Sequence, residues 1–534
     1  SNLELFEDST EELEKDAEAD NSDTEELQAD VKDDFSDGEA AVVGAGDSSE
    51  VVDSGSCGNN ATYKLYGDGR LVIEGSGVVF SWQFRNDGRI KSVEIGEGIT
   101  SLNYESWGGV FEDCGNLTSV TLPKSLTSLG NRTFSFCRNL STIVLPENLT
   151  SIGEGTFSYC ENLSSINIPE GVTAIGSNTF YNCKSLKDVV LPEGVTTIGE
   201  YAFQNCSNLS SVNIPKSVTS IKRGAFSQCK ELNNIVLPEG LTTVEGGTFY
   251  NCSSLSSINI PNSVTSIGET AFASCSSLSS IALPDSLTSI GNGAFSGIGI
   301  KEITFLDCLT DIGTGVFSSC VDLRSVKLPS GLKRITDSMF SGCGRLNSIV
   351  IPESVTEIGE EAFSGCGSLT EINLPAGVTT IEARAFSNAG VTEFKLPNGL
   401  KTIGDSAFSG GQYSTITVPE SVTDIGKSAF SSNDNLKTVE LPDSITEIKD
   451  SIFYDDYNLE SIKLPKNLKT IGEHAFTWCR SIKSLEIPDS VTEIGEYAFS
   501  ACYGLEAIHL SKGLTNVVYG TFVDCSKLKD ITIP

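Results

Sequence analysis

The sequence predicts an elongated solenoid, with a parallel β-sheet along one face and coil or short helical turns along the other. The first observation is a motif, P-x-x-[VLI]-T-x-I-x-x-x-x-F-x-x-C-x-x-L-x-x-[IV]-x-[IL], that recurs in about 19 units of 22–23 residues between residues 96 and 534. The second is that all 17 prolines fall on one position of this motif. The third is the length, because 534 residues exceed one globular core, whereas the units of a solenoid pack only against their neighbours.

The strand of each unit is predicted from the alternation of residues before the proline. In the segment Ile166-Asn167-Ile168, the isoleucines face the core and Asn167 faces solvent. The proline then ends the strand, where its missing N–H does least harm. The next apolar positions, Ile175 and Phe180 in this unit, fill the turn and the far side. The stretch between them is too short for a long helix, so we expect an extended segment or a single helical turn.

Two segments precede the repeated units. Residues 1–50 contain 19 Asp or Glu and two Lys, so residues 1–56 are expected to form an acidic, disordered spacer. The chain begins with Ser1 and shows no signal peptide, so any secretion signal is expected to have been removed. Residues 57–95 are predicted to form an N-terminal β cap over the first unit, with a hairpin around Gly67-Asp68-Gly69 and a further strand over 89–95.

Composition and motifs exclude several classes of function. The net charge is −35, and because nucleic acid needs Lys and Arg to pair with its phosphates, no nucleic-acid partner is expected. No apolar run is long enough for a transmembrane segment. The histidines, His474 and His509, cannot form a metal pair, and no phosphate-binding G-x-x-x-x-G-K-[ST] motif is present. We therefore predict no enzymatic activity, no cofactor and no metal site.

Fourteen of the 16 cysteines occupy one position of the motif, three residues after the phenylalanine. In other units a different residue takes this position: Ala389, Gly411, Asn433 and Asp456. A disulfide partner could not be replaced so freely. We therefore predict a column of buried free thiols at a tight turn, where Asn or Asp can bond the same backbone groups. Cys57 and Cys308 lie outside this column.

A second regular array lies four residues after the proline. This position is Thr in 16 of 19 units and Lys in the others, at Lys333, Lys401 and Lys469. We interpret the array as a ladder of hydroxyl groups that bond the adjacent coil. The alternative is a flat threonine surface that binds ordered water or glycans, and the three lysines would interrupt such a surface.

Residues 191–209 contain the pattern LP-x-x-[VL]-T-x-I-G-x-x-A-F-x-x-C-x-x-L without a gap. This pattern resembles the BspA-type repeats of bacterial surface proteins, a branch of the leucine-rich repeat superfamily. Cys57-Gly58 and the spaced glycines of residues 69–77 resemble the segment that precedes such repeats. The resemblance covers residues 57–534. It implies a leucine-rich repeat solenoid in a secreted or surface-anchored bacterial protein, often one that binds host or bacterial partners, and it names no ligand.

The outward residues of the predicted strands differ along the chain. The 16 positions from Ser119 to Ala282 include one charge, Asp188, whereas the 20 positions from Glu302 to His509 include eight charges. Because curvature makes an extended surface, we expect the concave strand face to bind a ligand, with a neutral hydrogen-bonding half and a mixed-charge half. The alternative is a solvated sheet face whose small residues fit a parallel ladder. The candidate ligand residues are Glu371, Asn373, Glu393, Lys395, Glu440, Lys463, Glu486 and His509.

The function predicted from these features is a non-catalytic extracellular binding or adhesion module that engages a host or bacterial-surface macromolecule, either protein or glycan. One alternative is a structural spacer or self-assembling surface-layer component without a soluble ligand, and the chain could be a monomer or associate end to end. Another is a polysaccharide-recognising accessory domain. The three tryptophans, Trp82, Trp107 and Trp478, lie in different regions and disfavour this last alternative.

Overall fold

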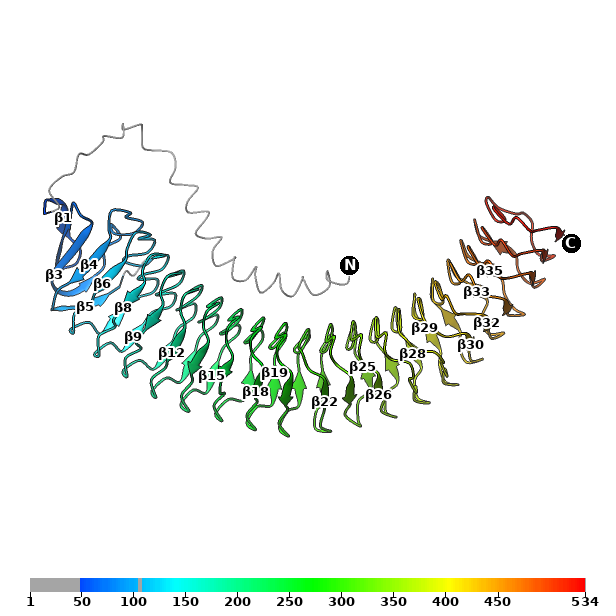
Figure 1. Ribbon diagram of the computed structural model, residues 1–534, viewed down its shortest axis with the longest axis horizontal. Helices are drawn as coiled ribbons and strands as arrows, with labels where there is room; N and C mark the ends of the chain where they lie inside the picture. Colours follow the sequence, from blue (N-terminus) through cyan, green and yellow to red (C-terminus); the bar gives the residue numbers. More distant parts are fainter. Residues whose placement is uncertain (1–48, 104–107, 534) are drawn as a thin grey trace, which may run out of the picture.

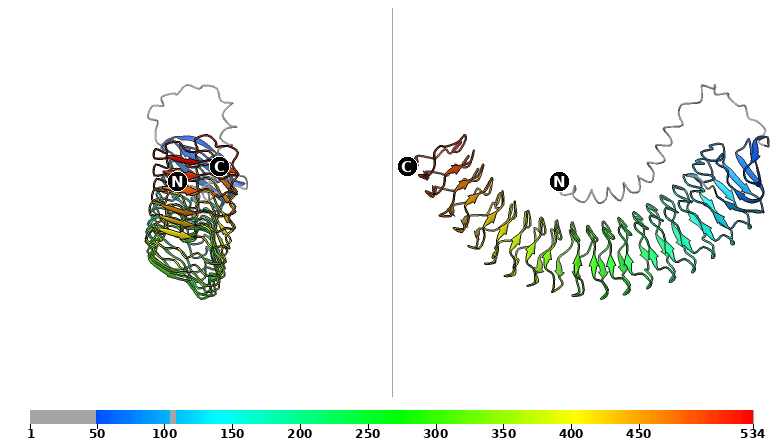
Figure 2. Two further views of the ribbon diagram at one scale, coloured as in Figure 1. Left: turned by 90° about the vertical axis from the view of Figure 1, so that its right-hand side faces the viewer. Right: turned by 180° about the vertical axis from the view of Figure 1, so that it is seen from behind.

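The computed structural model describes residues 49–103 and 108–533, and these form a long, curved stack of rungs (Figure 1). Figure 2 shows the same arc from behind and along its length. The predicted parallel β-solenoid is therefore confirmed. The described residues contain no helix, so tight turns take the place of the expected short helical turns. Residues 1–48 of the expected spacer, and Trp107, lie outside the described residues.

Tight turns replace helical turns because the backbone around each phenylalanine alternates between right-handed and left-handed φ values. Tyr201 and Asn205, two residues before and two residues after Phe203, have φ values of 53° and 57°. A right-handed helix cannot pass through such left-handed residues. The same alternation recurs in other units, where Asn, Ser and Gly often occupy these positions.

In most rungs, one strand joins a first parallel ladder just before the proline position. This is the strand predicted from the alternation, and its inward residues, such as Val189 and Val212, lie opposite one another in the core. The strands are β4 (Ser92–Ile95), β6 (Ser119–Thr121), β8 (Thr142–Ile143), β10 (Ser165–Ile166), β12 (Asp188–Val190), β14 (Ser211–Asn213), β16 (Asn234–Ile235), β18 (Ser257–Asn259), β20 (Ser280–Ala282), β22 (Glu302–Thr304), β24 (Ser325–Lys327), β26 (Ser348–Val350), β30 (Thr415–Thr417), β32 (Thr438–Glu440), β34 (Ser461–Lys463), β36 (Ser484–Glu486), β38 (Ala507–His509) and β39 (Asp530–Thr532).

A second parallel ladder follows the proline in each rung, and sequence reasoning did not predict it. Ile198 and Ile221 are paired in this ladder and buried. Most of its strands are two residues long, too short for an alternation to be recognised. They are β5 (Ile99–Leu102), β7 (Ser128–Leu129), β9 (Ser151–Ile152), β11 (Ala174–Ile175), β13 (Thr197–Ile198), β15 (Ser220–Ile221), β17 (Thr243–Val244), β19 (Ser266–Ile267), β21 (Ser289–Ile290), β23 (Asp311–Ile312), β25 (Arg334–Ile335), β27 (Glu357–Ile358), β28 (Thr380–Ile381), β29 (Thr402–Ile403), β31 (Asp424–Ile425), β33 (Glu447–Ile448), β35 (Thr470–Ile471) and β37 (Glu493–Ile494).

The N-terminal cap contains the predicted hairpin, formed by β2 (Asn60–Tyr66) and β3 (Arg70–Val79). The first half of β3 pairs with β4 and the second half with β5, so one strand begins both ladders. A third strand, β1 (Val51–Ser56), pairs antiparallel with β2. It lies inside the range expected to be a disordered spacer, so the cap begins earlier than predicted. The acidic composition that led to the spacer prediction ends at residue 50, just before β1. The predicted boundary between spacer and cap was therefore placed a few residues too late.

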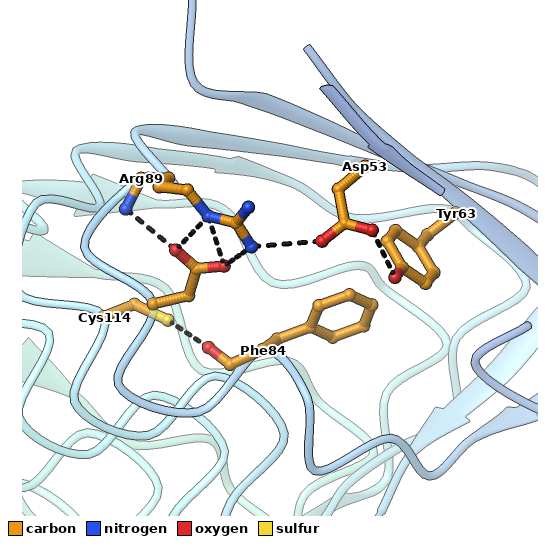
Figure 3. Close-up of polar contacts among 6 residues, drawn as sticks. Asp53, Tyr63, Phe84, Arg89 and Cys114 are labelled. Atoms are coloured by element: carbon orange, nitrogen blue, oxygen red, sulfur yellow. Dashed lines mark hydrogen bonds and ion pairs between the residues drawn. The ribbon is translucent and has the colours of Figure 1, made fainter. Parts of the chain in front are cut away.

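An ion-pair network fixes β1 to the first rung (Figure 3). The Arg89 guanidinium lies 3.1 Å from Asp53 Oδ2, and the Tyr63 hydroxyl donates a hydrogen bond of 3.1 Å to Asp53 Oδ1. Asp87 holds the same guanidinium from the other side, at 2.6 Å. The hydrogen bond to Asp87 is the main reason why the pKa of Arg89 is raised. The network thus connects β1, β2 and the segment that leads into β4.

The phenylalanines form one continuous column of stacked rings inside the solenoid. Phe203 and Phe226 are fully buried, and their centroids lie 5.4 Å apart with the ring planes 5° from parallel. Phe84, outside the repeated motif, stacks on Phe111 at 5.6 Å and extends the column into the cap. Tyr63 then meets Phe84 edge-on at 4.9 Å and closes the column (Figure 3).

Backbone hydrogen bonds run along the same side of the molecule. The N–H of each phenylalanine donates to the carbonyl of the residue before the next unit's phenylalanine, as in Phe203 N to Ala225 O at 2.8 Å. This bond is present at all 18 junctions between Phe111 and Phe522. The turns around the phenylalanines therefore hold the rungs together without interruption.

The predicted column of free thiols is confirmed, since all 16 cysteines are unpaired. Each thiol of the column donates to the phenylalanine carbonyl of the preceding unit, as in Cys229 Sγ to Phe203 O at 3.2 Å. Burial raises the pKa of most of these thiols, to about 12 for Cys275, whereas the hydrogen bond with Cys502 lowers the pKa of Cys525. Outside the column, Cys57 is buried and Cys308 is exposed.

The threonine array is the predicted hydroxyl ladder. Thr196 donates to Thr173 O twice, from its backbone N–H at 2.9 Å and from its hydroxyl at 3.3 Å. The same hydroxyl contact recurs from Thr288 to Thr265 O at 3.1 Å. The array therefore bonds neighbouring rungs to one another.

Candidate functional site

All eight candidate ligand residues are exposed and occupy the outward positions just before the proline position of their units; we call this side of the solenoid, which carries the first ladder, the strand face. Lys395 and Glu393 are the clearest case, with 79% and 73% of their side chains exposed. These residues are exposed because the strand alternation turns their neighbours, such as Phe394, into the core. That the strand face lies along the concave edge of the arc stays a prediction.

The charged candidates form pairs of opposite charge along the strand face. Glu440 lies opposite Lys463 in the ladder, and Glu393 Oε1 lies 3.9 Å from Lys395 Nζ. Such exposed pairs contribute only about 0.2–1 kcal/mol each, so they leave the side chains available to a ligand. Glu486 lies opposite His509 in a separate stretch of the ladder, because β34 and β36 are not paired. The eight residues therefore form separate groups on one face.

The first ladder has its longest interruption between β26 and β30. Neither residues 371–373 nor residues 393–395 form a strand there. The second ladder continues without a break from β25 to β31 in the same rungs. The phenylalanine column also continues, with ring centroids 5.3 Å apart between Phe363 and Phe386. The opening is therefore confined to the strand face.

Two shortened units lie within or beside this opening. Units 375–396 and 397–418 are each one residue shorter than their neighbours, and unit 284–305, next to another break in the first ladder, is short as well. Each short unit lacks the column cysteine and has Ile298, Ala389 or Gly411 instead. The missing residue lies between the cysteine position and the strand position, so the strand position follows the turn one residue sooner. In unit 397–418, fully buried Tyr413 fills the gap and donates to Phe408 O at 2.9 Å.

A shallow, open hollow of about 210 Å³ lies where the ladder opens. Glu371 and Asn373, both predicted from the sequence, line one side of it. Val350, 82% exposed, lines the other side. Buried side chains such as Ile349 form the base. Apolar surface with a few polar groups around it is typical of a place where a ligand side chain inserts.

Sequence reasoning missed Val350, although it occupies an outward strand position. Outward valines also occur in the other half of the strand face, where Val144, Val190 and Val236 are 74%, 68% and 70% exposed. Asparagines occupy the same position in the units between these valines. The Asn167 side-chain amide accepts from Leu145 N–H and donates to Leu145 O, both at 2.9 Å. The half expected to be hydrogen-bonding is therefore partly apolar. The exposed valines were the sequence signal for this apolar surface, and they were overlooked because only charged residues were compared along the strand face.

The described ranges, 49–103 and 108–533, offer no cluster of three or more His, Cys, Asp or Glu that could hold a metal ion. His474 Nδ1 lies 3.1 Å from Thr477 Oγ1, and His509 lies opposite Thr532 as well as Glu486. In the same part of the chain, no helix is long and apolar enough to cross a membrane.

The sequence profile of the BspA type leucine rich repeat region matches this chain six times. Together the matches cover residues 79–534, which is most of the chain. They extend over 79–209, 156–275, 196–321, 242–370, 356–481 and 446–534. No curated protein sequence matches the chain.

Three solved structures illustrate the similarity. A leucine-rich repeat protein from Bacteroides ovatus is 25% identical, with 89% of this chain and 93% of that chain covered and a TM-score of 0.39. One from Eubacterium ventriosum is 23% identical, with 67% and 94% covered and a TM-score of 0.42. A leucine rich cell surface protein from Faecalibacterium prausnitzii is 23% identical, with 89% and 93% covered and a TM-score of 0.27.

Proposed function

The chain belongs to the family of BspA-type leucine-rich repeat proteins, and from this premise we propose that it is a non-catalytic module that binds a macromolecule through its strand face. The observation that supports this most is the hollow between β26 and residues 371–373. There the predicted residues Glu371 and Asn373 meet the exposed Val350. An apolar anchor beside acceptor groups suits a side chain or sugar that projects from a larger ligand.

A macromolecule fits this surface better than a small molecule. The hollow is shallow and open, whereas small-molecule sites enclose most of their ligand. The groups beside it, Glu393 with Lys395 and Glu440 with Lys463, extend the polar surface over several rungs. A ligand that spans these rungs would gain contacts at each of them. The ligand is a protein or glycan of the host or of a bacterial surface.

We place this function outside the cell or at its surface, where the BspA-type repeats that this chain resembles are found. Sixteen free thiols would ordinarily be at risk of oxidation there. Burial and raised pKa values keep most of them as thiols rather than reactive thiolates. The thiol column is therefore compatible with an oxidising environment.

The proposal is tested by screening the full chain against extracellular matrix proteins, bacterial surface polymers and glycans at physiological salt. We expect a saturable interaction that weakens when Glu371→Gln, Glu393→Gln, Lys395→Gln and Lys463→Gln are combined. These exposed substitutions should leave the melting temperature unchanged. A folded protein that binds nothing in the screen would instead support a structural spacer or a self-assembling component.

A further inference from the structure

Aromatic side chains gather on the surface of three successive rungs, 442–464, 465–487 and 488–510, away from the strand face. They extend from the turns around the phenylalanine column, at positions that are mostly small or polar in other units. We call this group the aromatic patch; it consists of Tyr454, Tyr457, Trp478, Arg480, Tyr497 and Tyr503. Sequence reasoning missed it because only tryptophans were considered as an aromatic surface.

The patch is built around the Arg480 guanidinium. Its central carbon lies 5.2 Å from the ring centroid of Tyr457, 5.4 Å from that of Trp478 and 5.7 Å from that of Tyr503. Tyr457, Arg480 and Tyr503 occupy the same position of three successive units, so ring, guanidinium and ring follow one another along the solenoid. Trp478 also stacks on Tyr454, with centroids 6.3 Å apart and planes 18° from parallel.

Trp478 occupies a position that the fold does not favour for tryptophan. Its φ is 68°, in the left-handed region that costs a bulky residue conformational energy. Most other units meet the same requirement with a small or polar residue, as at Asn205 and Gly342, and two meet it with an aromatic residue, Phe136 and Tyr159. The indole is 40% exposed, so core packing does not offset this cost. Trp478 therefore combines a strained backbone with a half-exposed ring that stacks on Tyr454 and Arg480, which suits a surface that contacts a ligand.

The charges around the patch restrict the ligand. The negative charge of Asp455 is the main reason why the pKa of the Tyr457 hydroxyl is raised, and the charge of Asp434 raises this pKa further. These acidic neighbours would repel an anionic polymer. A cationic ligand would compete with Arg480, which already occupies the space between the rings. The remaining ligand class is neutral.

We propose that the aromatic patch binds a neutral glycan, with the pyranose rings stacked on the exposed aromatic faces. The apolar C–H face of a sugar suits Trp478 and Tyr503, which are each about 40% exposed. Sugar hydroxyls can donate to the exposed carboxylate of Asp434 and accept from the Tyr503 hydroxyl. A proline-rich peptide also has an apolar face but offers few donors for such a carboxylate. This site is separate from the hollow on the strand face, so a test of the aromatic patch does not depend on whether the strand face binds a ligand.

The test is native electrophoresis of the full chain through gels that contain a soluble β-glucan, a galactomannan or an arabinoxylan, with heparin and a decaproline peptide as comparison ligands. We expect at least one neutral polysaccharide to slow the protein, and heparin and decaproline to have no effect. Trp478→Asn and Tyr503→Ala should each weaken this binding by about tenfold, since stacking on one aromatic ring can supply such an energy. Trp478→Asn introduces a residue that other units have at this position, so the variant should fold at least as well as the wild-type protein.

Trp82→Ala is the matched control, because Trp82 is 70% exposed and lies in the cap at the other end of the solenoid. This variant, and the combined strand-face variant with Glu371→Gln, should bind the polysaccharide as the wild type does. The proposal is overturned if no neutral polysaccharide slows the protein, or if Trp82→Ala weakens binding as much as Trp478→Asn. Binding of decaproline without binding of any glycan would likewise overturn it and assign the patch to a proline-rich peptide.

Discussion

At the scale of single residues, each recurring position of the unit has a contact that explains its residue type. The thiol of Cys229 satisfies the buried carbonyl of Phe203, and the Thr196 hydroxyl adds a second hydrogen bond to the exposed carbonyl of Thr173. These partners lie in the preceding rung, so each residue stabilises the stacking of rungs. The residue types of the thiol and threonine columns could therefore be interpreted from the sequence. Their partners could not be identified, because the side of the rung on which a carbonyl points depends on the turn geometry.

The phenylalanine column predicts a large local cost for its loss. Phe272 is fully buried between Phe249 and Phe295, at 5.4 and 5.7 Å. Phe272→Ala should lower the free energy of unfolding by about 3–5 kcal/mol, as measured by urea denaturation. Val236→Ala, at a residue 70% exposed, serves as the control and should change it by less than about 0.5 kcal/mol. If Phe272→Ala were as stable as the wild-type protein, the phenylalanine column would not contribute to the stability of the solenoid.

The thiols predict a sharp division in chemical reactivity. Burial raises the pKa of Cys275 and Cys366 to about 12, so at pH 8 almost none of these groups is thiolate. A thiol reagent should therefore label exposed Cys308 first in the native protein, and Cys308→Ser should abolish this rapid phase. Labelling of the other cysteines should require unfolding, except for the half-buried Cys525. Rapid labelling of many thiols in the folded protein would contradict the structure.

Asp456 predicts an unusual dependence of stability on pH. It occupies the cysteine position, accepts from Asn433 N at 2.7 Å, and is fully buried, so burial raises its pKa well above the usual range. The folded state therefore retains a proton that the unfolded state loses above about pH 3.9, and stability falls as the pH rises through that region. Asp456→Asn should raise the melting temperature at pH 7, with a difference that disappears near pH 3. A lower melting temperature for the variant at pH 7 would show that the carboxyl is stabilising.

At the scale of elements, the sequence was informative where a pattern was long enough. The first-ladder strands and the hairpin of β2 and β3 follow from alternation over several residues and from the turn at 67–69. The strands of the second ladder are mostly two residues long and give no such pattern. β1 was missed because its sequence, VVDSGS, follows an acidic segment and pairs only with the hairpin. Pairing with a neighbour, rather than local preference, determines these elements.

The cap network predicts that β1 can be loosened without unfolding the solenoid. Asp53→Ala removes the half-exposed contacts with Arg89 and Tyr63 that connect β1 to the first rung and leaves the Arg89–Asp87 pair in place. We expect a loss of only about 0.2–1 kcal/mol. Amide hydrogen exchange should become faster in β1 and remain unchanged in β14. Faster exchange throughout the solenoid would instead mean that the cap controls the stability of the whole stack.

At the scale of the whole molecule, the sides of the solenoid differ in continuity. The hydrogen bonds beside the phenylalanine column are present at every junction, whereas the first ladder is interrupted, most of all between β26 and β30. The hydrogen bonds beside the phenylalanine column therefore hold the rungs together, and strand pairing on the strand face can be interrupted without separating the rungs. The sequence predicted Glu371 and Asn373 because polar residues at outward strand positions can be recognised from the alternation. It could not predict the hollow, because the gap lies between two units of ordinary length and depends on how neighbouring rungs pack.

The most direct test of the central claim, that the strand face binds a macromolecule at the hollow, is a pair of dissociation constants for the ligand found in the screen. Val350→Arg places a long charged side chain at the hollow, and Val190→Arg places the same side chain on the same face away from it. Both valines are exposed, so both variants should fold. We predict that Val350→Arg weakens binding by at least about tenfold, or about 1.4 kcal/mol, while Val190→Arg leaves it within about twofold. Equal dissociation constants for Val350→Arg and the wild-type protein would contradict the claim.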